Sequence, residues 1–241
     1  MNRLVADVRV ARGSFDLDVS FSLGERRTLA IVGPNGAGKS SLVGALAGFV
    51  EVGEGRILVG DRVISDTAAG IDLPMDKRRV GVVFQDHLLF PHLTVLQNVA
   101  FGPRSVGRED AVAHAAAWLD RLGIASLAAQ HPRQLSGGQA QRVALARTLA
   151  AEPSVFVLDE PFASLDVEVR DEVRAEVALH LGSFTGHTIL VSHDIDDVAA
   201  LADEVLVIES GRVSQRGTLA EIQATPATAY IRRLLSGRGE N

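Results

Sequence analysis

A glycine-rich segment followed by a lysine and a serine is the part of the sequence best suited to bind phosphate. Residues 33–40 read Gly-Pro-Asn-Gly-Ala-Gly-Lys-Ser and match the pattern G-x-x-x-x-G-K-[ST]. Glycines let successive backbone N–H groups turn inward around phosphate oxygens, and a following helix offers its positive end to the anion. We expect the Lys39 ammonium to reach the β- and γ-phosphates and the Ser40 hydroxyl to ligate Mg²⁺. The predicted phosphate-binding residues are Gly33, Pro34, Asn35, Gly36, Ala37, Gly38, Lys39, Ser40 and Ser41.

Two adjacent carboxylates, Asp159 and Glu160, follow the apolar segment 155–158. The end of a strand is where an α/β sheet places its ligand site. We expect Asp159 to hold Mg²⁺ through its water shell and Glu160 to polarise an attacking water. Strands also often end in acidic turn residues, so this pattern alone leaves both interpretations open. Combined with the glycine-rich loop, it indicates a nucleoside triphosphatase.

A third segment has the residue types of a second anion site. Ser136 and two glycines open a helix that runs to about residue 151, and they expose N–H groups and a hydroxyl. A serine that only caps its helix is the alternative interpretation. The segment consists of Leu135, Ser136, Gly137, Gly138 and Gln139.

The elements that must position these residues alternate along the chain. Apolar side chains at every second residue predict a half-buried strand over 15–23, and short apolar runs predict buried strands. The expected strands are residues 15–23, 28–32, 56–59, 62–64, 79–84, 155–158, 188–192 and 205–208. The expected helices include residues 39–49 and 136–151, with short helices between 219 and 235. This order predicts an α/β fold with a mainly parallel sheet, helices on both faces and a helical insertion over residues 87–150.

Composition excludes several classes of protein. The chain has 241 residues and no cysteine, which excludes disulfides, thiolate catalysis and Cys-ligated zinc or iron–sulfur sites. A net charge of −6 disfavours a general nucleic-acid binder, so no nucleic-acid partner is expected. Leu42 to Val50 form the longest apolar run, which is far shorter than the roughly 20 residues of a membrane helix. The N-terminus does not resemble a signal peptide, so we expect the chain to stay in the cytosol.

The order of the three segments resembles the ATP-binding cassette (ABC) ATPases. The glycine-rich loop is followed by Leu-Ser-Gly-Gly-Gln at 135–139 and by Leu-Asp-Glu-Pro at 158–161, and the resemblance covers essentially the whole chain. It implies that Glu160, His193, Lys39 and Gln85 serve catalysis and that Ser40, Gln85 and Asp159 hold Mg²⁺ beside ATP. The residues that resemble the family's D-loop are Ser164, Leu165 and Asp166.

The resemblance also implies an architecture. A P-loop NTPase (RecA-like) core and an N-terminal antiparallel β subdomain would occupy residues 1–86 and 151–241, and a helical subdomain over 87–150 would carry the signature segment. The last helices end at Asn241, so we expect no β-rich C-terminal regulatory domain. Family members usually stack adenine on an aromatic residue, for which Phe15 is the candidate. Phe15 also begins an apolar alternation, so a core role is the alternative.

The implied assembly is a two-fold pair of cassettes, either a homodimer or a pair with a homologue. Each signature segment would cap the partner's ATP, and hydrolysis would drive separate integral membrane permease subunits. A periplasmic or lipoprotein solute-binding protein would take part indirectly. A single cassette without a membrane span resembles a prokaryotic importer subunit more than an exporter or a soluble ABC ATPase. It would lie at the cytoplasmic face of the membrane.

The segments 70–74, 77–86 and 89–92 look most like molybdate-importer ATPases. Related cassettes for sulfate, iron, thiamine, polyamines and sugars share much of this stretch, so these cargoes remain alternatives. The permease is expected to dock along residues 85–104, in a groove lined by residues 87–92. Packing between subdomains is the alternative explanation for those apolar side chains.

Overall fold

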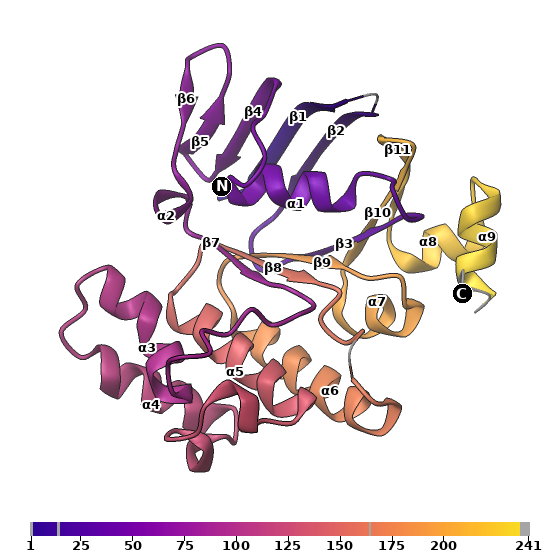
Figure 1. Ribbon diagram of the computed structural model, residues 1–241. Coiled ribbons are helices and arrows are strands. Elements are labelled where there is room, and N and C mark those ends of the chain that lie inside the picture. The colour runs from indigo at the N-terminus through magenta and orange to yellow at the C-terminus, as the bar shows by residue number, and fades with distance from the viewer. Residues whose placement is uncertain (1, 14, 164, 237–241) are drawn as a thin grey trace.

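The computed structural model describes residues 2–13, 15–163 and 165–236. Within these residues, eleven strands form one sheet in the order β6-β5-β4-β1-β2-β11-β10-β3-β9-β8-β7 (Figure 1). The strands are β1 (Leu4–Arg12), β2 (Phe15–Leu23), β3 (Thr28–Val32), β4 (Glu54–Val59), β5 (Arg62–Asp66), β6 (Ile71–Asp72), β7 (Val80–Val83), β8 (Val155–Asp159), β9 (His187–Val191), β10 (Glu204–Glu209) and β11 (Arg212–Gly217). The helices are α1 (Lys39–Ala47), α2 (Met75–Arg78), α3 (Val95–Ser105), α4 (Ala111–Arg121), α5 (Gly137–Ala150), α6 (Val167–Ser183), α7 (Ile195–Leu201), α8 (Leu219–Ala224) and α9 (Ala229–Leu235), with short 3₁₀ turns at Ala125–Leu127 and Pro132–Gln134.

The sheet has a parallel part and an antiparallel part. Strands β7, β8, β9, β3 and β10 pair in parallel, whereas β1, β2, β4, β5 and β6 pair antiparallel. The two parts join where β11 meets β2, with Arg212 opposite Asp18 and an ion pair of 2.8 Å between their side chains. The expected α/β fold with a parallel core and an N-terminal antiparallel part is therefore confirmed.

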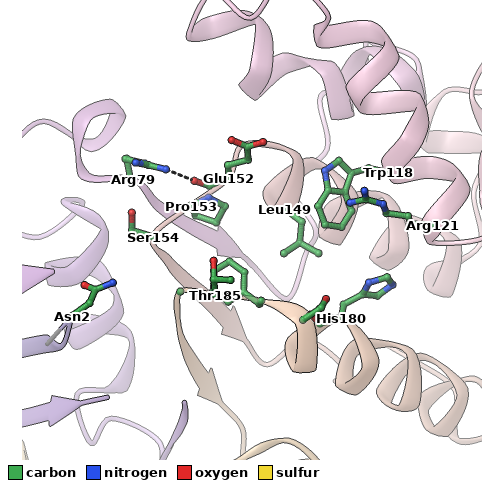
Figure 2. Close-up of a pocket in the computed structure, with 13 residues that line it drawn as sticks. Asn2, Arg79, Trp118, Arg121, Leu149, Glu152, Pro153, Ser154, His180 and Thr185 are labelled. Atoms are coloured by element: carbon green, nitrogen blue, oxygen red, sulfur yellow. Dashed lines mark hydrogen bonds between the residues drawn. The ribbon is translucent and has the colours of Figure 1, made fainter. Parts of the chain in front are cut away.

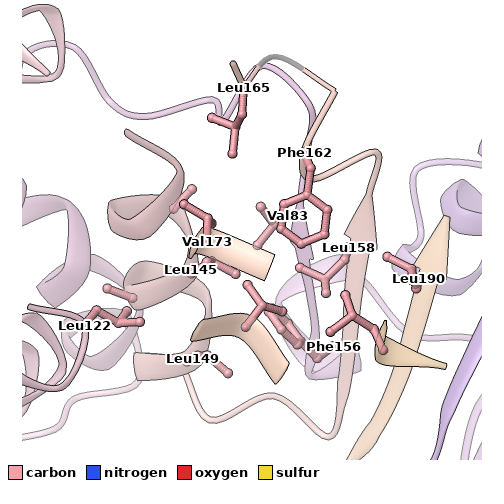
Figure 3. Close-up of a cluster of buried hydrophobic side chains, with 14 of the residues drawn as sticks. Val83, Leu122, Leu145, Leu149, Phe156, Leu158, Phe162, Leu165, Val173 and Leu190 are labelled. Atoms are coloured by element: carbon pink, nitrogen blue, oxygen red, sulfur yellow. The ribbon is translucent and has the colours of Figure 1, made fainter. Parts of the chain in front are cut away.

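The buried strands are apolar on both faces because each face covers its own core. In β8, Phe156 and Leu158 belong to the core beneath α5 and α6 (Figure 3), whereas Val155 and Val157 belong to the core that includes α1. Successive side chains point to opposite faces, so a continuous apolar run fills both cores at once. Figure 1 shows α1 on one side of β7, β8 and β9 and the helices α3 to α6 on the other.

Helices α3, α4 and α5 pack against one another, away from the antiparallel strands (Figure 1). They occupy most of residues 87–150, the stretch predicted to be helical. Among the described residues, no helix combines the length and the apolar character that crossing a bilayer requires.

Several element boundaries differ from the prediction by one or two residues, and two of these differences have a local structural cause. Helix α1 ends at Ala47 rather than at residue 49, because Gly48 takes a left-handed conformation with φ of 90°. Arg79 was expected to start a strand, but it caps α2 with φ of 54°, and its carbonyl accepts the N–H of Ser154 at 2.8 Å. Strands β1, β6 and β11 and helix α2 are not in the prediction.

One buried arginine holds the C-terminal end of α1. The Arg78 side chain is 1% exposed and donates to the Ala45 carbonyl at 2.7 Å and, through Nε, to the Leu73 carbonyl at 2.7 Å. It also pairs with Asp72. A Cβ on Gly48 would lie 2.7 Å from Arg78 Nε, so glycine is required there for steric as well as conformational reasons. The helix that follows the glycine-rich loop is thus fixed at its far end.

Candidate functional site

A pocket of about 570 Å³ opens where β3 and β8 end, and it gathers most of the predicted site residues. Its volume falls within the range of roughly 300–1,000 Å³ seen for small-molecule sites. The predicted residues that line it are Phe15, Asn35, Gly36, Ala37, Gly38, Lys39, Ser40, Ser41, Gln85, Asp159, Glu160 and His193. Segments far apart in the sequence therefore converge on one cavity.

The glycine-rich loop connects β3 to α1 in a path that admits no larger residue at two points. A Cβ on Gly33 would lie 2.1 Å from the Ile208 carbonyl oxygen. Gly38, the N-cap of α1, has φ of 106°, and a Cβ there would lie 2.7 Å from a Leu17 methyl group. This path places the N–H groups at the start of α1 at the wall of the pocket, where they suit an anion.

Lys39 is the cation that the glycine-rich loop contributes to the pocket. Its ammonium donates to the carbonyls of Gly33 at 2.7 Å and Pro34 at 3.1 Å, so it is folded over the loop. Burial lowers the pKa of Lys39, while Glu160 and Asp159 act in the opposite direction. Burial and then the nearby Glu160 raise the pKa of Asp159, against the effect of Lys39. A bound cation beside Asp159 would offset both of the causes that raise its pKa.

Glu160 and His193 form a pair at the mouth of the pocket. His193 Nδ1 lies 2.9 Å from Glu160 Oε2, and the histidine side chain is 65% exposed whereas the glutamate is 19% exposed. Glu160 has a left-handed φ of 50°, and its N–H donates to the Val191 carbonyl at 2.9 Å. This backbone turn aims the carboxylate into the cavity rather than along β8.

The backbone on both sides of His193 is tied to α6. The buried Ser192 hydroxyl donates to Asp197 Oδ2 at 2.8 Å, and Asp197 Oδ1 accepts from Arg174 Nε at 2.8 Å. On the other side, Asp194 pairs with Arg170 at 3.1 Å. Both arginines project from α6, so this helix and the histidine loop are linked by two charged contacts.

Sequence reasoning did not identify that network, nor did it identify Arg12, which also lines the pocket. Arg12 ends β1, a strand that was not predicted. Ser192 and Asp197 flank the predicted His193, but only the fold shows that their side chains meet. The acid-rich run of α7 was the one signal available in the sequence.

The donor set of the pocket fits Mg²⁺. Ser40, Gln85 and Asp159 contribute a hydroxyl, an amide and a carboxylate to its lining, and Mg²⁺ prefers oxygen ligands. Within the described ranges, no group of three or more His, Asp or Glu side chains is placed to hold a metal ion. In the usual Mg²⁺ site, one or two carboxylates act together with substrate phosphates and waters.

The segment 135–139 does not line this pocket. Ser136 is the N-cap of α5 in a capping box: its Oγ accepts from Gln139 N at 3.3 Å, and Gln139 Oε1 accepts from Ser136 N at 2.9 Å. The capping role is thus present, and the anion-binding role remains a prediction. Gly138 has no room for a side chain, because a Cβ would lie 2.8 Å from a methyl group of Val169 on α6.

The remaining predicted residues have different surroundings. Leu165 is buried, and Asp166 is the N-cap position of α6. Ser164 lies outside the described residues. Phe15 lines the pocket and also packs against the core on the α1 side of the sheet, so both of its predicted roles remain compatible with its position.

The stretch expected to dock a permease is partly exposed. Leu88 is 55% exposed, and Phe90 packs against the exposed Phe101 with 4.6 Å between ring centroids. His87 is instead buried: its Nδ1 lies 2.8 Å from the Gln85 carbonyl oxygen and its Nε2 lies 3.2 Å from that of Gly137. Packing explains His87, whereas Leu88 and Phe101 present apolar surface.

Comparisons with known proteins agree with this geometry. The sequence model described as ABC transporter matches residues 17–163. A molybdenum import ATP-binding protein of Mycobacterium tuberculosis is 44% identical over 224 residues, which cover 90% of this chain and 61% of the relative. One of Rhodospirillum rubrum is also 44% identical, with 91% and 59% covered. An Fe(3+) ions import ATP-binding protein of Streptomyces coelicolor is 39% identical, with 90% and 62% covered.

The chain thus spans about three fifths of the length of these relatives. Among solved structures, a nucleotide-free ATP-binding cassette from an ABC transporter superposes with a TM-score of 0.80 at 25% identity, covering 97% of this chain and 98% of that one. With the family model matched over more than half of its residues, and with its glycine-rich loop, acidic strand end and histidine around one pocket, the chain belongs to the ABC transporter family.

Proposed function

We propose that the chain binds and hydrolyses ATP as the motor subunit of an ABC importer. One observation carries this proposal: Lys39, Asp159, Glu160 and His193 line a single pocket at the start of α1. Cationic, acidic and imidazole groups around a cradle of backbone N–H groups are what phosphoryl transfer to water requires.

We propose a role for each of these side chains. The N–H groups of residues 36–40 and the Lys39 ammonium bind the β- and γ-phosphates. Ser40, Asp159 and Gln85 hold Mg²⁺, which when bound neutralises charge on the phosphate oxygens. Glu160 orients the attacking water and takes its proton, as the bond from the γ-phosphorus to ADP breaks and inorganic phosphate forms. His193 donates to a γ-phosphate oxygen, and its contact with Glu160 fixes the ring.

A second cassette would complete the site. The signature residues Ser136 and Gly138 lie outside the chain's own pocket, at the N-terminal end of helix α5. We propose a two-fold pair of cassettes in which each signature segment covers the ATP of its partner. We also propose that residues 1–86 and 151–241 form the nucleotide-binding part and residues 87–150 a helical subdomain. ATP then closes the pair, and hydrolysis opens it.

The transport role rests on the relatives. Their names describe ATP-binding proteins for import of molybdenum, Fe(3+), sn-glycerol-3-phosphate and spermidine or putrescine. We therefore propose separate permease subunits as partners at the cytoplasmic face of the membrane, with a solute-binding protein acting indirectly. The exposed Leu88 and Phe101 supply apolar surface for that docking. Molybdate is the proposed cargo, because the molybdenum relatives reach 44% identity and the iron relatives reach 39%.

The test is uptake of labelled molybdate, iron, sulfate and polyamine in cells that lack this chain. We expect molybdate uptake to fall and to return with the wild-type chain but not with Glu160→Gln. The purified variant should bind ATP, lose about 100-fold or more of its hydrolysis and accumulate as an ATP-bound dimer in size-exclusion chromatography. The amide keeps the shape of the carboxylate but cannot accept the proton.

The outcomes separate the parts of the proposal. If uptake of a different solute falls instead, the proposed motor function stands and that solute replaces molybdate as the proposed cargo. The importer role would be contradicted if the purified chain hydrolyses ATP but cells that lack the chain take up every solute at the wild-type rate. Wild-type hydrolysis by Glu160→Gln would remove Glu160 as the base. Asp61→Asn, a matched loss of charge at the exposed turn between β4 and β5, should behave as wild type.

A further inference from the structure

A second cavity, of about 690 Å³, shares no lining residue with the nucleotide pocket. It lies between α4, the end of α5, the start of β8 and the last turns of α6 (Figure 2). Its volume is within the range of roughly 300–1,000 Å³ typical of small-molecule sites. Its walls belong to elements far apart in the sequence, so the cavity is a product of the fold and not of one loop.

The floor of this cavity is apolar. Leu149 and Pro153 lie between the guanidinium groups of Arg79 and Arg121 in Figure 2, and Phe184 adds a ring whose centroid is 5.8 Å from that of the buried Phe156. A hydrocarbon or aromatic ligand body would bury itself here and release water. These side chains favour a ligand that is at least partly apolar.

One end of the cavity carries an arginine with unused donors. The Arg121 guanidinium lies over the Trp118 ring, 4.8 Å from its centroid. In the part of the chain that the structure describes, Arg121 forms no hydrogen bond and no ion pair. Stacking on an aromatic face holds the guanidinium plane and leaves its N–H groups free to bind an anion.

The charge balance of the lining residues also favours an anion. Glu152 is their one acidic group, and its carboxylate is already paired with Arg108 at 2.8 Å. Arg79 donates to the Glu152 carbonyl oxygen at 2.9 Å rather than to a carboxylate. Two guanidinium charges therefore remain without an acidic partner among the residues that line the cavity.

A histidine stands beside the free guanidinium. The rings of His180 and Trp118 have centroids 6.3 Å apart. Burial, and then the positive charge of Arg121, lower the pKa of His180. An anion bound between Arg121 and His180 would offset the effect of the Arg121 charge on His180, so both side chains favour an anion at this position.

We propose that this cavity binds a small amphiphilic organic anion. Its carboxylate, sulfonate or phosphate group binds Arg121 beside His180, and its apolar body covers Leu149, Pro153 and Phe184. The ligand would connect α4 with the start of β8, at a distance from the nucleotide site.

The probe for the experiment is 8-anilinonaphthalene-1-sulfonate, compared with N-phenyl-1-naphthylamine, which has the same rings and no sulfonate. Trp118 is the one tryptophan of the chain, so probe emission excited through tryptophan arises from energy transfer from Trp118. We expect saturable binding of the sulfonate to the wild-type chain. Its dissociation constant should be roughly tenfold higher for Arg121→Gln, because the variant loses a charge-assisted hydrogen bond. The uncharged probe should bind alike to wild type and variant.

Arg56→Gln, the same change at an exposed position of β4, is the matched control and should bind the sulfonate as wild type does. Saturating ATP with Mg²⁺ should leave binding of the sulfonate intact. Circular dichroism and the thermal midpoint confirm that both variants are folded. Equal sulfonate affinity of the two variants, or displacement of the probe by ATP, would overturn the proposal.

Discussion

Arg78 shows what a buried charge contributes when backbone carbonyls surround it. Replacing it with leucine should lower the free energy of unfolding by about 3 kcal/mol, because the carbonyls of Ala45 and Leu73 lose their donor inside the protein. Arg78→Lys should recover only part of this loss, since a single ammonium cannot reach acceptors on two segments. Urea unfolding followed by circular dichroism measures the difference.

Lys77→Leu is the control for this experiment, since it removes a neighbouring exposed charge from the same short helix. We expect a change within about 0.5 kcal/mol, as for most surface substitutions. A loss of similar size in both variants would show that charge near α2, and not the carbonyl contacts, is responsible.

His187 makes stability depend on pH. The residue is fully buried at the start of β9, and its Nδ1 donates to the Gly24 carbonyl at 2.9 Å, while no partner of Nε2 is found among the described residues. Burial lowers the pKa of His187 in the fold, against smaller effects of Gly24 and Glu25. The pKa of this histidine in the unfolded chain is about 6.5, so below that pH the unfolded chain binds a proton that the folded chain does not. The contribution of the neutral, buried His187 to stability is therefore lost as pH falls.

The measurement is the free energy of unfolding between pH 7.5 and pH 5 for wild type and His187→Gln. The wild-type curve should fall more steeply below about pH 6.5, by up to about 1.4 kcal/mol per pH unit. His92→Gln, at an exposed position, should keep the wild-type slope. Parallel curves for wild type and His187→Gln would contradict the assignment.

Residue types and their spacing alone predicted pocket-lining residues where a local pattern defines them. The glycine-rich loop requires Gly33 and Gly38 for close approach and a left-handed turn, and those demands are visible as a pattern. His193 and Gln85 came only through family resemblance. Arg12 and Asp197 depend on contacts between distant segments, which no local pattern encodes.

At the scale of elements, α6 and the loop that carries His193 act as one unit. The contacts of Asp197 with Arg174 and Ser192 hold this loop against α6. Burial raises the pKa of Asp197, whereas these two contacts act in the opposite direction. Asp197→Asn keeps the size of the side chain but offers one acceptor oxygen to two donors. We expect ATP hydrolysis to fall by roughly tenfold with ATP affinity retained, because small displacements of a reacting group are costly.

A double variant separates positioning from general destabilisation. In a His193→Ala background, Asp197→Asn should add little further loss of hydrolysis, since the two changes act through one side chain. Asp196→Asn, at the exposed neighbouring position, should retain wild-type hydrolysis. Additive losses in the double variant would show that Asp197 does not act through His193.

Secondary-structure elements were predictable where a strong local sequence signal defines them. The strand at 28–32 and the helix after Ser136 have the predicted positions because an apolar run and an N-cap are local signals. Strand β1 carries the alternation Leu4, Ala6, Val8 and Val10, but the charged residues between them weaken this signal. Arg79 looked like part of a strand, but its left-handed turn is set by contacts with residues near 154.

At the scale of the whole molecule, one sheet joins two kinds of pairing and separates two cores. The alternation of side chains in β8 serves both cores, so the sequence predicted burial but not which core each residue joins. The join between β11 and β2 was not predictable, because β11 is polar and pairs with β2 at one residue. The division into subdomains remains a prediction.

The neighbours of β3 have a consequence for biosynthesis. Strand β3 leads into the glycine-rich loop, yet it pairs with β9 and β10, which are translated long after it. Chains emerge from the ribosome from the N-terminus at about 5–20 residues per second, so β3 waits many seconds for its partners. The nascent chain therefore cannot form a finished nucleotide pocket until residues 204–209 have left the exit tunnel, and β3 has both of its neighbours only from then on.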